Sequence, residues 1–474
     1  MRKRLLAALI VAFAVVAPSL ADAPQEPPPT GAVVRAAKID TSLRDAAAAI
    51  DTWRASLPES LRGLSAGELE RRWPRWIRDR DREIRARVAQ GDEDSLVNLW
   101  LYGTSFTDLP RAVEPDMSRA AGLTPQAIVT GRLGDLLDGI ADPGANERLQ
   151  FARGVVERHG LNPASQGDRE RIRGLVSDMR TRMIAQFNDY DRGLRAADRS
   201  GDPSEVLSTH AVLFRDRGLS TDTSVLVNFA IDEALGAMAR SGTIAPGGLR
   251  HVGLVGPGLE MTNKADGQDF YPPQTLQPFA LMDSVVSRAL ADARQLQVTT
   301  FDVSPRVNQH LEGARRRARD GQSYTFHVAL PGDEPWRPEL VAFTKRLGAS
   351  IGESARAAAV PPTAGAVTVR AVQVRPAAVL AVHPADVNVI VERLAPLPAS
   401  ERFDLIVATN ILVYYGRFEQ ALAMTNLASM LKPGGILLTN SAVFPVPPFK
   451  ASAQQLRVVY SDRQYDQLFW YERE

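Results

Sequence analysis

The chain has 474 residues, 45% of them hydrophobic and 23% charged, with 56 Lys and Arg, 55 Asp and Glu, and no cysteine. This apolar content is sufficient for a packed core and excludes a wholly disordered chain, and the length favours two or three domains over one. The absence of cysteine excludes thiol catalysis, disulfides, iron–sulfur clusters and cysteine-ligated zinc.

The first 21 residues have the three-part pattern of a secretory signal peptide. Arg2, Lys3 and Arg4 precede an apolar run, and small residues follow up to Ala21, after which we expect cleavage. This predicts a protein exported to the periplasm or secreted, with an uncleaved membrane anchor as the alternative. Loss of three basic residues leaves the mature chain slightly acidic, which excludes a globally basic nucleic-acid-binding protein.

Residues 22–40 contain a proline-rich stretch and are expected to form an extended linker. From residue 41 to 221, apolar residues recur at three- and four-residue spacing, most clearly at 73–88 and 172–194. This periodicity predicts amphipathic helices and hence an all-α domain. Nothing in its sequence indicates its role.

Residues 71–87 of this helical region carry eight arginines against three acidic residues. One interpretation is a surface for phosphates or anionic lipid headgroups, and therefore association with a membrane surface. The other is the solvated face of a helix whose Trp73 and Trp76 side is buried. We favour the solvated face.

Beyond residue 222, and most clearly after 248, short runs rich in Val, Ile and Leu alternate with helical segments. The predicted strands are residues 251–255, 298–301, 387–391, 403–407 and 436–439. Buried strands that alternate with helices form parallel sheets covered on both faces, so the pattern predicts a doubly wound α/β sheet preceded by the all-α domain. In such sheets ligands bind beyond the carboxyl ends of the strands.

Two of these strand ends carry residues suited to a nucleotide ligand. Gly256, Pro257 and Gly258 follow the first strand, where glycines permit a sharp turn and close approach of the backbone to a ligand. Asp302 and Val303 follow the second, and the carboxylate can accept hydrogen bonds from ribose hydroxyls. An N-cap of the next helix is the alternative role of Asp302, and the two roles are compatible.

Residues 401–440 read ERFDLIVATNILVYY, then an amphipathic helix, then LKPGGILLTN. Together with VTTFDVSPRVNQHLEGARRRA at 298–318, this stretch resembles the class I S-adenosylmethionine-dependent methyltransferases, which have a Rossmann-like fold. Residues 401–440 are also similar to chemotaxis-receptor methyltransferases. The resemblance covers residues 222–474 and implies an insertion at about 320–385 and a closing antiparallel hairpin near the C-terminus.

The resemblance implies S-adenosylmethionine as cofactor and a methyl acceptor that the sequence does not identify. The site residues that it implies are Gly256, Pro257, Gly258, Glu260, Asp302, Val303, Glu392, Thr409 and Asn410. Glu260 would lie near the methionine amino group and Glu392 near the adenine. Asn410 would lie near the transferred methyl or would only form a turn. Tyr414 and Tyr415 are expected to be packing aromatics.

The chain departs from the family pattern in its first motif. Leu254 stands where the family has an acid, and Glu260 stands at the third glycine position. The 44 residues from Gly258 to Asp302 exceed the roughly 20 of a typical nucleotide-binding unit. The surplus, residues 263–277, is a polar loop that we expect to form a lid over the site. An active methyltransferase and a non-catalytic relative that serves binding or scaffolding both fit this sequence.

Other classes of site have less support. The G-x-G-x-x-G fingerprint of nicotinamide enzymes fails at Met261, which makes an oxidoreductase the weakest of the three hypotheses. The six histidines have no metal-ligand spacing, so we expect no metal site. No G-x-x-x-x-G-K-[ST] motif is present, which argues against a P-loop NTPase. The oligomeric state is not predicted.

Overall fold

The computed structural model describes residues 36–113, 116–117, 122–200, 217–259, 266–332 and 334–474. The predicted signal peptide, most of the predicted linker and Glu260 lie outside these ranges. The last part of the predicted linker forms strand β1 (Ala37–Asp40), which pairs antiparallel with β8 (Glu392–Ala395). The chain therefore already belongs to the folded unit at Ala37.

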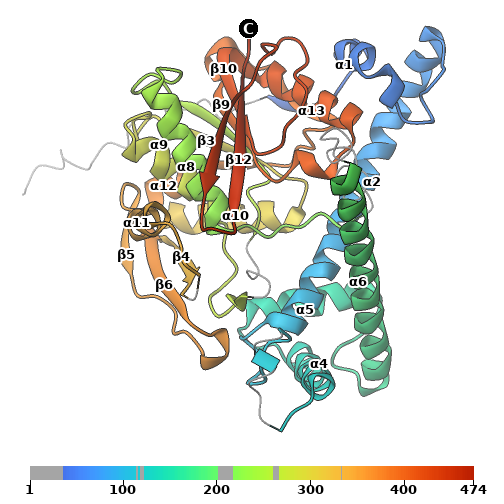
Figure 1. The fold of residues 1–474 in the computed structure, drawn as a ribbon, viewed down its shortest axis with the longest axis vertical. Coiled ribbons are helices and arrows are strands. Elements are labelled where there is room, and N and C mark those ends of the chain that lie inside the picture. Colours follow the sequence, from blue (N-terminus) through green and yellow to red (C-terminus); the bar gives the residue numbers. More distant parts are fainter. Residues whose placement is uncertain (1–35, 114–115, 118–121, 201–216, 260–265, 333) are drawn as a thin grey trace, which may run out of the picture. The chain divides into compact units, whose positions relative to one another are not determined.

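Helices dominate the described residues from 47 to 200 (Figure 1). They are α1 (Ala47–Thr52), α2 (Ala66–Tyr102), α4 (Pro125–Ala141), α5 (Glu147–Arg158) and α6 (Arg169–Ser200). The helices predicted at 73–88 and 172–194 are confirmed as parts of α2 and α6. Their apolar faces pack into one cluster that includes Leu96, Leu136 and Val155. Among the described helices, none combines the length and the apolar composition needed to cross a membrane.

A seven-stranded, mostly parallel sheet forms the centre of the C-terminal half, in the order β11-β12-β10-β9-β2-β3-β7. The strands are β2 (His251–Val255), β3 (Gln297–Phe301), β7 (Val382–Ala385), β9 (Phe403–Ala408), β10 (Leu431–Thr439), β11 (Gln454–Val459) and β12 (Tyr465–Glu472). The pairs among β2, β3, β7, β9 and β10 are parallel, and β12 pairs antiparallel with both β10 and β11. The predicted α/β sheet and its closing hairpin are confirmed.

The strand order reverses at β2. From β2 the chain continues outward to β3 and β7 on one side, and β9 and β10 follow on the other side. The carboxyl ends of β2 and β9 are therefore the switch point at which α/β sheets bind ligands. The helices of this half are α8 (Val225–Arg240), α9 (Gln277–Ser287), α10 (Pro305–Arg319), α11 (Pro338–Arg346), α12 (Pro376–Leu380) and α13 (Arg417–Met430).

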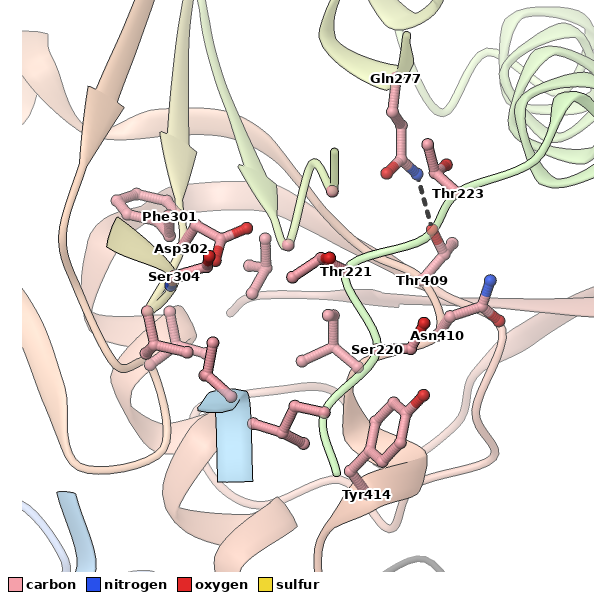
Figure 2. Close-up of a pocket in the computed structure, with 18 of the residues that line it drawn as sticks. Ser220, Thr221, Thr223, Gln277, Phe301, Asp302, Ser304, Thr409, Asn410 and Tyr414 are labelled. Atoms are coloured by element: carbon pink, nitrogen blue, oxygen red, sulfur yellow. Dashed lines mark hydrogen bonds between the residues drawn. The ribbon is translucent and has the colours of Figure 1, made fainter. Parts of the chain in front are cut away.

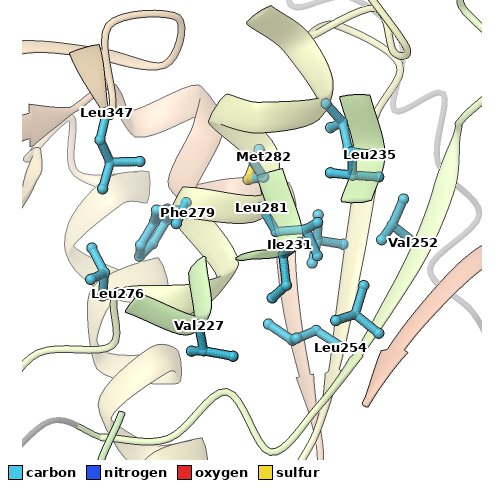
Figure 3. Close-up of a cluster of buried hydrophobic side chains, with 14 of the residues drawn as sticks. Val227, Ile231, Leu235, Val252, Leu254, Leu276, Phe279, Leu281, Met282 and Leu347 are labelled. Carbon is cyan, nitrogen blue, oxygen red and sulfur yellow. The ribbon is translucent and has the colours of Figure 1, made fainter. Parts of the chain in front are cut away.

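The main hydrophobic core lies between this sheet and helices α8 and α9 (Figure 3). Ile231 of α8, Phe279 of α9 and Leu254 of β2 all belong to this core, and each is at most 1% exposed. Each such side chain contributes about 2 kcal/mol when it is removed from water. Leu254, where the resemblance leads us to expect an acid, is therefore a core residue, and a carboxylate there would be buried among apolar groups.

The predicted third strand, residues 387–391, is wrong, because these residues form a loop. The third parallel strand is β7 (Val382–Ala385), five residues earlier. The sequence VHPA does not read as a buried strand because it carries His383 and Pro384. Proline is tolerated there because β7 is the edge strand of the sheet.

Much of the predicted insertion folds as a small separate sheet. Strands β4 (Tyr324–Pro331), β6 (Val367–Val374) and β5 (Gly352–Ala355) pair antiparallel in that order. Phe326 of β4 and Phe343 of α11 are fully buried and join the main core. This sheet therefore extends the core of the larger sheet.

Asp232 of α8 is fully buried and joins three helices through two arginines. Arg288, directly after α9, donates to both carboxylate oxygens at 2.9 and 2.7 Å, and Arg346 at the end of α11 also pairs with Asp232. Burial alone would raise the pKa of Asp232, but the hydrogen bonds and positive charges of the arginines outweigh it and lower the pKa. The carboxylate therefore stays ionised in the core at neutral pH.

We predict that Asp232→Asn lowers the free energy of unfolding by about 2 kcal/mol at pH 7, because it leaves two arginines facing a neutral amide. The folded pKa of Asp232 lies below the unfolded value, so its contribution is present at neutral pH and is lost as the pH falls through the folded pKa. Urea unfolding at several pH values measures this. Glu233→Gln is the matched control, since Glu233 is 35% exposed and contacts Arg288 at 3.3 Å. Equal losses in both variants would contradict the prediction.

Candidate ligand site at the strand ends

A cavity of about 400 Å³ lies beyond the carboxyl ends of β2, β3, β7 and β9 (Figure 2). This volume is within the range of about 300–1,000 Å³ that small-molecule sites occupy. The residues that directly follow the strands line one side of it. Residues 219–224, which we call the covering segment, line the other side together with Val88 of α2, Ile411 and residues 413–415.

Two glycines turn the chain where β2 ends. Gly256 and Gly258 have φ angles of 63° and 69°, in the left-handed region that favours glycine. A Cβ atom at Gly258 would lie 2.6 Å from the carbonyl oxygen of Thr221, and one at Gly256 would lie 2.2 Å from the Cδ1 atom of Ile411. The backbone N–H of Leu259 donates to the same Thr221 oxygen at 2.7 Å. The covering segment therefore rests directly on this turn.

Asp302 is the buried carboxylate of the cavity. It accepts a hydrogen bond from the backbone N–H of Ser304 at 2.7 Å, and the backbone of Gly258 also donates to it. Burial raises the pKa of Asp302 to about 7, and these hydrogen bonds lower it only in part. Further donors, such as ligand hydroxyls, would stabilise the ionised form. The alternative role of Asp302 as helix N-cap is wrong, because Ser304 holds that position in α10.

The cavity is acidic. Asp222 and Asp302 line it, whereas none of the described residues along its wall is lysine or arginine. Hydroxyl and amide groups make up the rest of its polar lining. A site with this charge favours a cationic ligand over a polyphosphate. Within the described ranges, no three His, Asp or Glu side chains are grouped as metal ligands.

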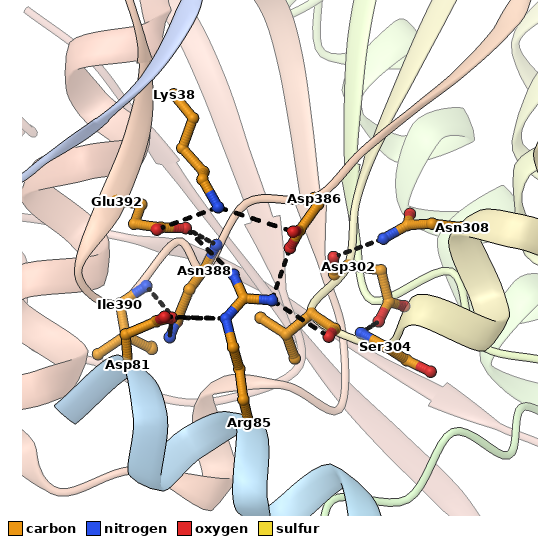
Figure 4. A network of polar contacts seen from close by, with 11 residues as sticks. Lys38, Asp81, Arg85, Asp302, Ser304, Asn308, Asp386, Asn388, Ile390 and Glu392 are labelled. Atoms are coloured by element: carbon orange, nitrogen blue, oxygen red, sulfur yellow. Dashed lines mark hydrogen bonds and ion pairs between the residues drawn. The ribbon is translucent and has the colours of Figure 1, made fainter. Parts of the chain in front are cut away.

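An ionic cluster around Arg85 of α2 fixes the loop after β7 (Figure 4). Arg85 pairs with Asp81 at 2.9 Å, Asp386 at 2.7 Å and Glu392 at 3.5 Å. Lys38 of β1 bridges Asp386 at 3.7 Å and Glu392 at 3.3 Å. The cluster therefore ties β1 and α2 to the loop that lines the cavity.

Glu392 belongs to this cluster and is not among the residues that line the cavity. Its carboxylate accepts the backbone N–H of Asn388 at 2.8 Å and faces Lys38 and Arg85. Burial raises its pKa, against the lowering effects of the Asn388 hydrogen bond and the two cations. The wall of the cavity carries Asn388 instead, which sequence analysis missed because it placed the third strand too late. The adenine contact of Glu392 stays a prediction.

Thr409 and Asn410 line the cavity directly after β9. The Thr409 hydroxyl accepts a hydrogen bond from Gln277 at 2.9 Å. Asn410 has a φ of 59°, and its backbone N–H and side-chain oxygen both bond the side chain of Asn440, at 2.8 and 2.6 Å. This geometry favours the turn-forming role of Asn410 over a role at the transferred methyl.

The cavity brings together six of the nine predicted site residues. These are Gly256, Gly258, Asp302, Val303, Thr409 and Asn410. Pro257 is buried beside the two glycines and is not part of the lining, and Glu392 lies in the ionic cluster. The structure does not describe Glu260.

Sequence analysis missed the covering segment and the position of two tyrosines. The run STDTS at 220–224 is rich in hydroxyl groups and directly precedes the apolar helix α8, and this contrast is the signal that could have found it. Tyr414 and Tyr415 both line the cavity. Tyr415 is 4% exposed and packs as expected, and the backbone of Ser220 hydrogen-bonds the hydroxyl of Tyr414.

Of the described part of the predicted lid, Gln277 alone lines the cavity, and the preceding loop turns toward the helical region. Asp269 accepts hydrogen bonds from the backbone N–H and the hydroxyl of Thr104, at 2.6 and 2.7 Å. Arg148 of α5 donates to the carbonyl groups of Asp269 and Tyr271 at 2.8 Å. This polar loop is therefore anchored to the helical region, and its first residues lie outside the described ranges.

Arginines of the basic stretch at 71–87 are engaged within the protein. Arg80 pairs with Glu83 at 2.8 Å and with Glu419, and Arg87 donates to the carbonyl oxygen of Tyr414 at 3.3 Å. These contacts supply a structural reason for the cluster of positive charge. Association with a membrane surface stays a prediction.

Comparison with known proteins found no matching family model and no matching curated protein. Solved structures similar to this chain are S-adenosylmethionine-dependent methyltransferases. Magnesium protoporphyrin IX methyltransferase (ChlM) from Synechocystis PCC 6803 is 11% identical, with 52% of this chain and 80% of that chain covered and a TM-score of 0.26. The N-methyltransferase NodS from Bradyrhizobium japonicum WM9 is 13% identical, with 51% and 85% covered and a TM-score of 0.24. These values transfer no activity to this chain.

We predict that Gly258→Ala destabilises the protein by about 3 kcal/mol, because it adds a clash with the Thr221 carbonyl to the strain of a left-handed φ. Gly434→Ala is the matched control. Its φ is 75° and nothing lies within 4 Å of the added Cβ, so only the strain of about 1 kcal/mol applies. Chemical unfolding measures both, and a control as unstable as Gly258→Ala would refute the clash.

We predict that Asp302→Asn stabilises the protein at pH 8, on the order of 2 kcal/mol. The folded pKa of about 7 lies above the usual value of 3.8, so the wild type loses stability as the pH rises between these values. The amide oxygen of the variant can still accept the Ser304 hydrogen bond. The difference should vanish near pH 4 in thermal or urea unfolding, and a variant less stable than wild type at pH 8 would contradict the assignment.

Proposed function

We propose that this protein binds S-adenosylmethionine in the strand-end cavity and transfers its methyl group to an acceptor. The observation that carries the proposal is the chemistry of the lining. A buried carboxylate, Asp302, stands opposite the left-handed turn at Gly256 and Gly258, and no described lining residue is basic. S-adenosylmethionine carries a sulfonium and an ammonium group, and its net positive charge suits an acidic cavity.

The residues present fit the three parts of this ligand. Asp302 would accept hydrogen bonds from the ribose hydroxyls, which supplies the donors that its buried carboxylate lacks. The backbone of the turn at Gly256 and Gly258, which lines the cavity, would hold the methionine moiety. Val387 and Asn388 would receive the adenine.

The chain contributes mainly by positioning. When bound, the sulfonium supplies a methyl group that is already electrophilic. The role of the protein is then to orient the two reactants and to exclude water. Orientation alone can account for a large part of the rate enhancement. The covering segment is suited to this role, because the Thr221 carbonyl accepts a hydrogen bond from Leu259 and the segment closes the cavity over the strand ends.

The same lining argues against a nicotinamide dinucleotide. A pyrophosphate brings two negative charges close to the glycine turn, and Asp222 and Asp302 would repel them. The third glycine of the nicotinamide fingerprint is replaced by Met261, which also argues against this ligand.

A non-catalytic protein that retains the ligand is the second candidate. Leu254 lies in the core, and the side-chain oxygen of Asn410 accepts a hydrogen bond from Asn440. Neither of these positions therefore presents a free polar group to the ligand. Binding without methyl transfer would establish this alternative.

We further propose that the protein acts outside the cytoplasm, with an acceptor in the cell envelope. The signal-peptide pattern of residues 1–21 and the absence of cysteine support export. The similarity of residues 401–440 to chemotaxis-receptor methyltransferases is confined to one strand–helix–strand unit, so it supports the cofactor site and not a particular acceptor.

We predict that S-adenosylmethionine and S-adenosylhomocysteine raise the melting temperature of the full chain and that NADH does not. Because ribose hydroxyls bind the ionised carboxylate, the affinity should be highest above pH 7 and should fall by up to about tenfold per unit below it. Isothermal titration calorimetry from pH 6 to 8 measures this.

Asp302→Asn is the control for this measurement. It should weaken binding at least tenfold and abolish the pH dependence, while the variant stays folded. An unchanged melting temperature of the wild type at millimolar ligand would refute the proposal. Radiolabelled methyl transfer to cell-envelope extract then separates the enzyme from the non-catalytic candidate.

A further inference from the structure

A second cavity, of about 780 Å³, adjoins the strand-end cavity on the side of the helical region. The two cavities share Ser220, Asp222 and Tyr414 on their walls. The shared residues belong to the covering segment and to the turn after β9, and Figure 2 shows Ser220 and Tyr414 side by side at this boundary. A molecule in the second cavity would therefore have one end at the strand-end site.

The walls of the second cavity are largely apolar. They come from three helices, α2, α4 and α6, through Leu101, Tyr102, Val129, Met183, Ile184 and Phe187. Ile184 and Phe187 are 39% and 58% exposed, and they lie on consecutive turns of α6. Large hydrophobic side chains that are exposed at the rim of a cavity mark a binding site more often than isolated ones do.

One cation of this cavity, Arg180, has no carboxylate partner among the described residues. Arg180 of α6 lies with its guanidinium carbon 5.7 Å from the centre of the Trp100 ring, and its buried Nε atom has no hydrogen-bond partner. In the part of the chain that the structure describes, no carboxylate pairs with Arg180. The neighbouring Arg182, in contrast, pairs with Glu93 at 3.1 Å and Asp94 at 2.8 Å.

A buried N–H group without a partner is rare in native proteins and calls for an explanation. Arginine binds carboxylates and related anions through its fixed set of donors. An anionic group of a ligand would satisfy Arg180, and the apolar walls would receive the rest of that ligand.

We propose that the second cavity binds the methyl acceptor, and that the acceptor is a small amphipathic molecule with a ring-sized apolar body and one anionic group. The anion lies at Arg180 and the reactive end lies at Asp222 and Tyr414, next to the methyl donor. This inference rests on the proposed function, since the shared wall is what connects the two sites. Three helices enclose the cavity, which favours a small molecule over a folded protein.

Two fluorescent probes of equal size test the charge. 1-Anilinonaphthalene-8-sulfonate has an apolar ring body and an anion, and N-phenyl-1-naphthylamine has the same body without the anion. We expect both to bind the full chain saturably. Arg180→Gln should weaken the sulfonate at least tenfold and the neutral probe less than twofold, because a charged hydrogen bond contributes about 1.5–3 kcal/mol. Arg173→Gln removes an arginine of α6 that pairs with Glu170 and should change neither.

Two filled variants test the location. Val129→Trp and Met183→Trp each place a large side chain into the cavity from a different helix, so both should displace both probes. Their affinity for S-adenosylhomocysteine should stay within twofold of wild type, which also shows that they are folded. If one variant fails to fold, the other still gives the answer.

The outcomes separate this inference from the function on which it rests. If a folded filled variant binds both probes as the wild type does, or if Arg180→Gln weakens the two probes equally, the acceptor site is overturned. The methyltransferase proposal would survive that result as long as S-adenosylhomocysteine binds. If the probes behave as expected and S-adenosylhomocysteine does not bind at millimolar concentration, the proposed function fails and the cavity is no acceptor site.

Discussion

The ion pairs of Arg85 hold helix α2 against the sheet, and the candidate site depends on that contact. Arg85 and Lys38 together neutralise Asp386 and Glu392 on the loop that carries Asn388 into the cavity. Burial alone would lower the pKa of Arg85, but hydrogen bonds to Asp386 and Asp81 outweigh it and raise the pKa, so the cation persists. Without it, three carboxylates would face one another at a half-buried interface. Two residues further along α2, the Arg87 carbonyl accepts the N–H of Leu219 at 2.9 Å and so positions the covering segment.

The site itself is built from features that cost stability. In the part of the chain that the structure describes, the carboxylate of Asp302 is buried with a raised pKa, the left-handed turn at Gly256 and Gly258 excludes any larger residue, and the cation of Arg180 has no carboxylate partner. Each of these would be replaced in a sequence selected for folding alone. Their concentration around two adjoining cavities, over a core as well packed as that of α8 and α9, is what marks these cavities as functional.

The sequence predicted the parts of this arrangement that local chemistry determines. Strands β2, β3, β9 and residues 436–439 of β10 are short, largely buried segments with few charged residues, and Asp302 and the two glycines directly follow β3 and β2. Strand β7 was not predicted, because its edge position tolerates Pro384, which is unusual in a strand. As a result the expected adenine contact was assigned to Glu392, whereas Asn388 lines the cavity. The covering segment was not predicted for another reason. Its position depends on contacts between residues that are far apart in the sequence. The same holds for the Arg85–Asp386 pair, whose two residues are 301 positions apart and therefore produce no local sequence pattern.

The two cavities differ in their charged lining, and in the proposed function this difference would orient the reactants. The strand-end cavity holds the carboxylate of Asp302 and suits a cation, whereas the second cavity holds Arg180 and suits an anion. In the proposed arrangement the anion of an amphipathic acceptor lies at Arg180, for which the described residues supply no carboxylate. Its uncharged end would then reach the boundary at Tyr414. The charge at Arg180 would therefore orient the acceptor before its reacting group makes any specific contact. The apolar walls of α2, α4 and α6 would then need only to fit the apolar body of the molecule.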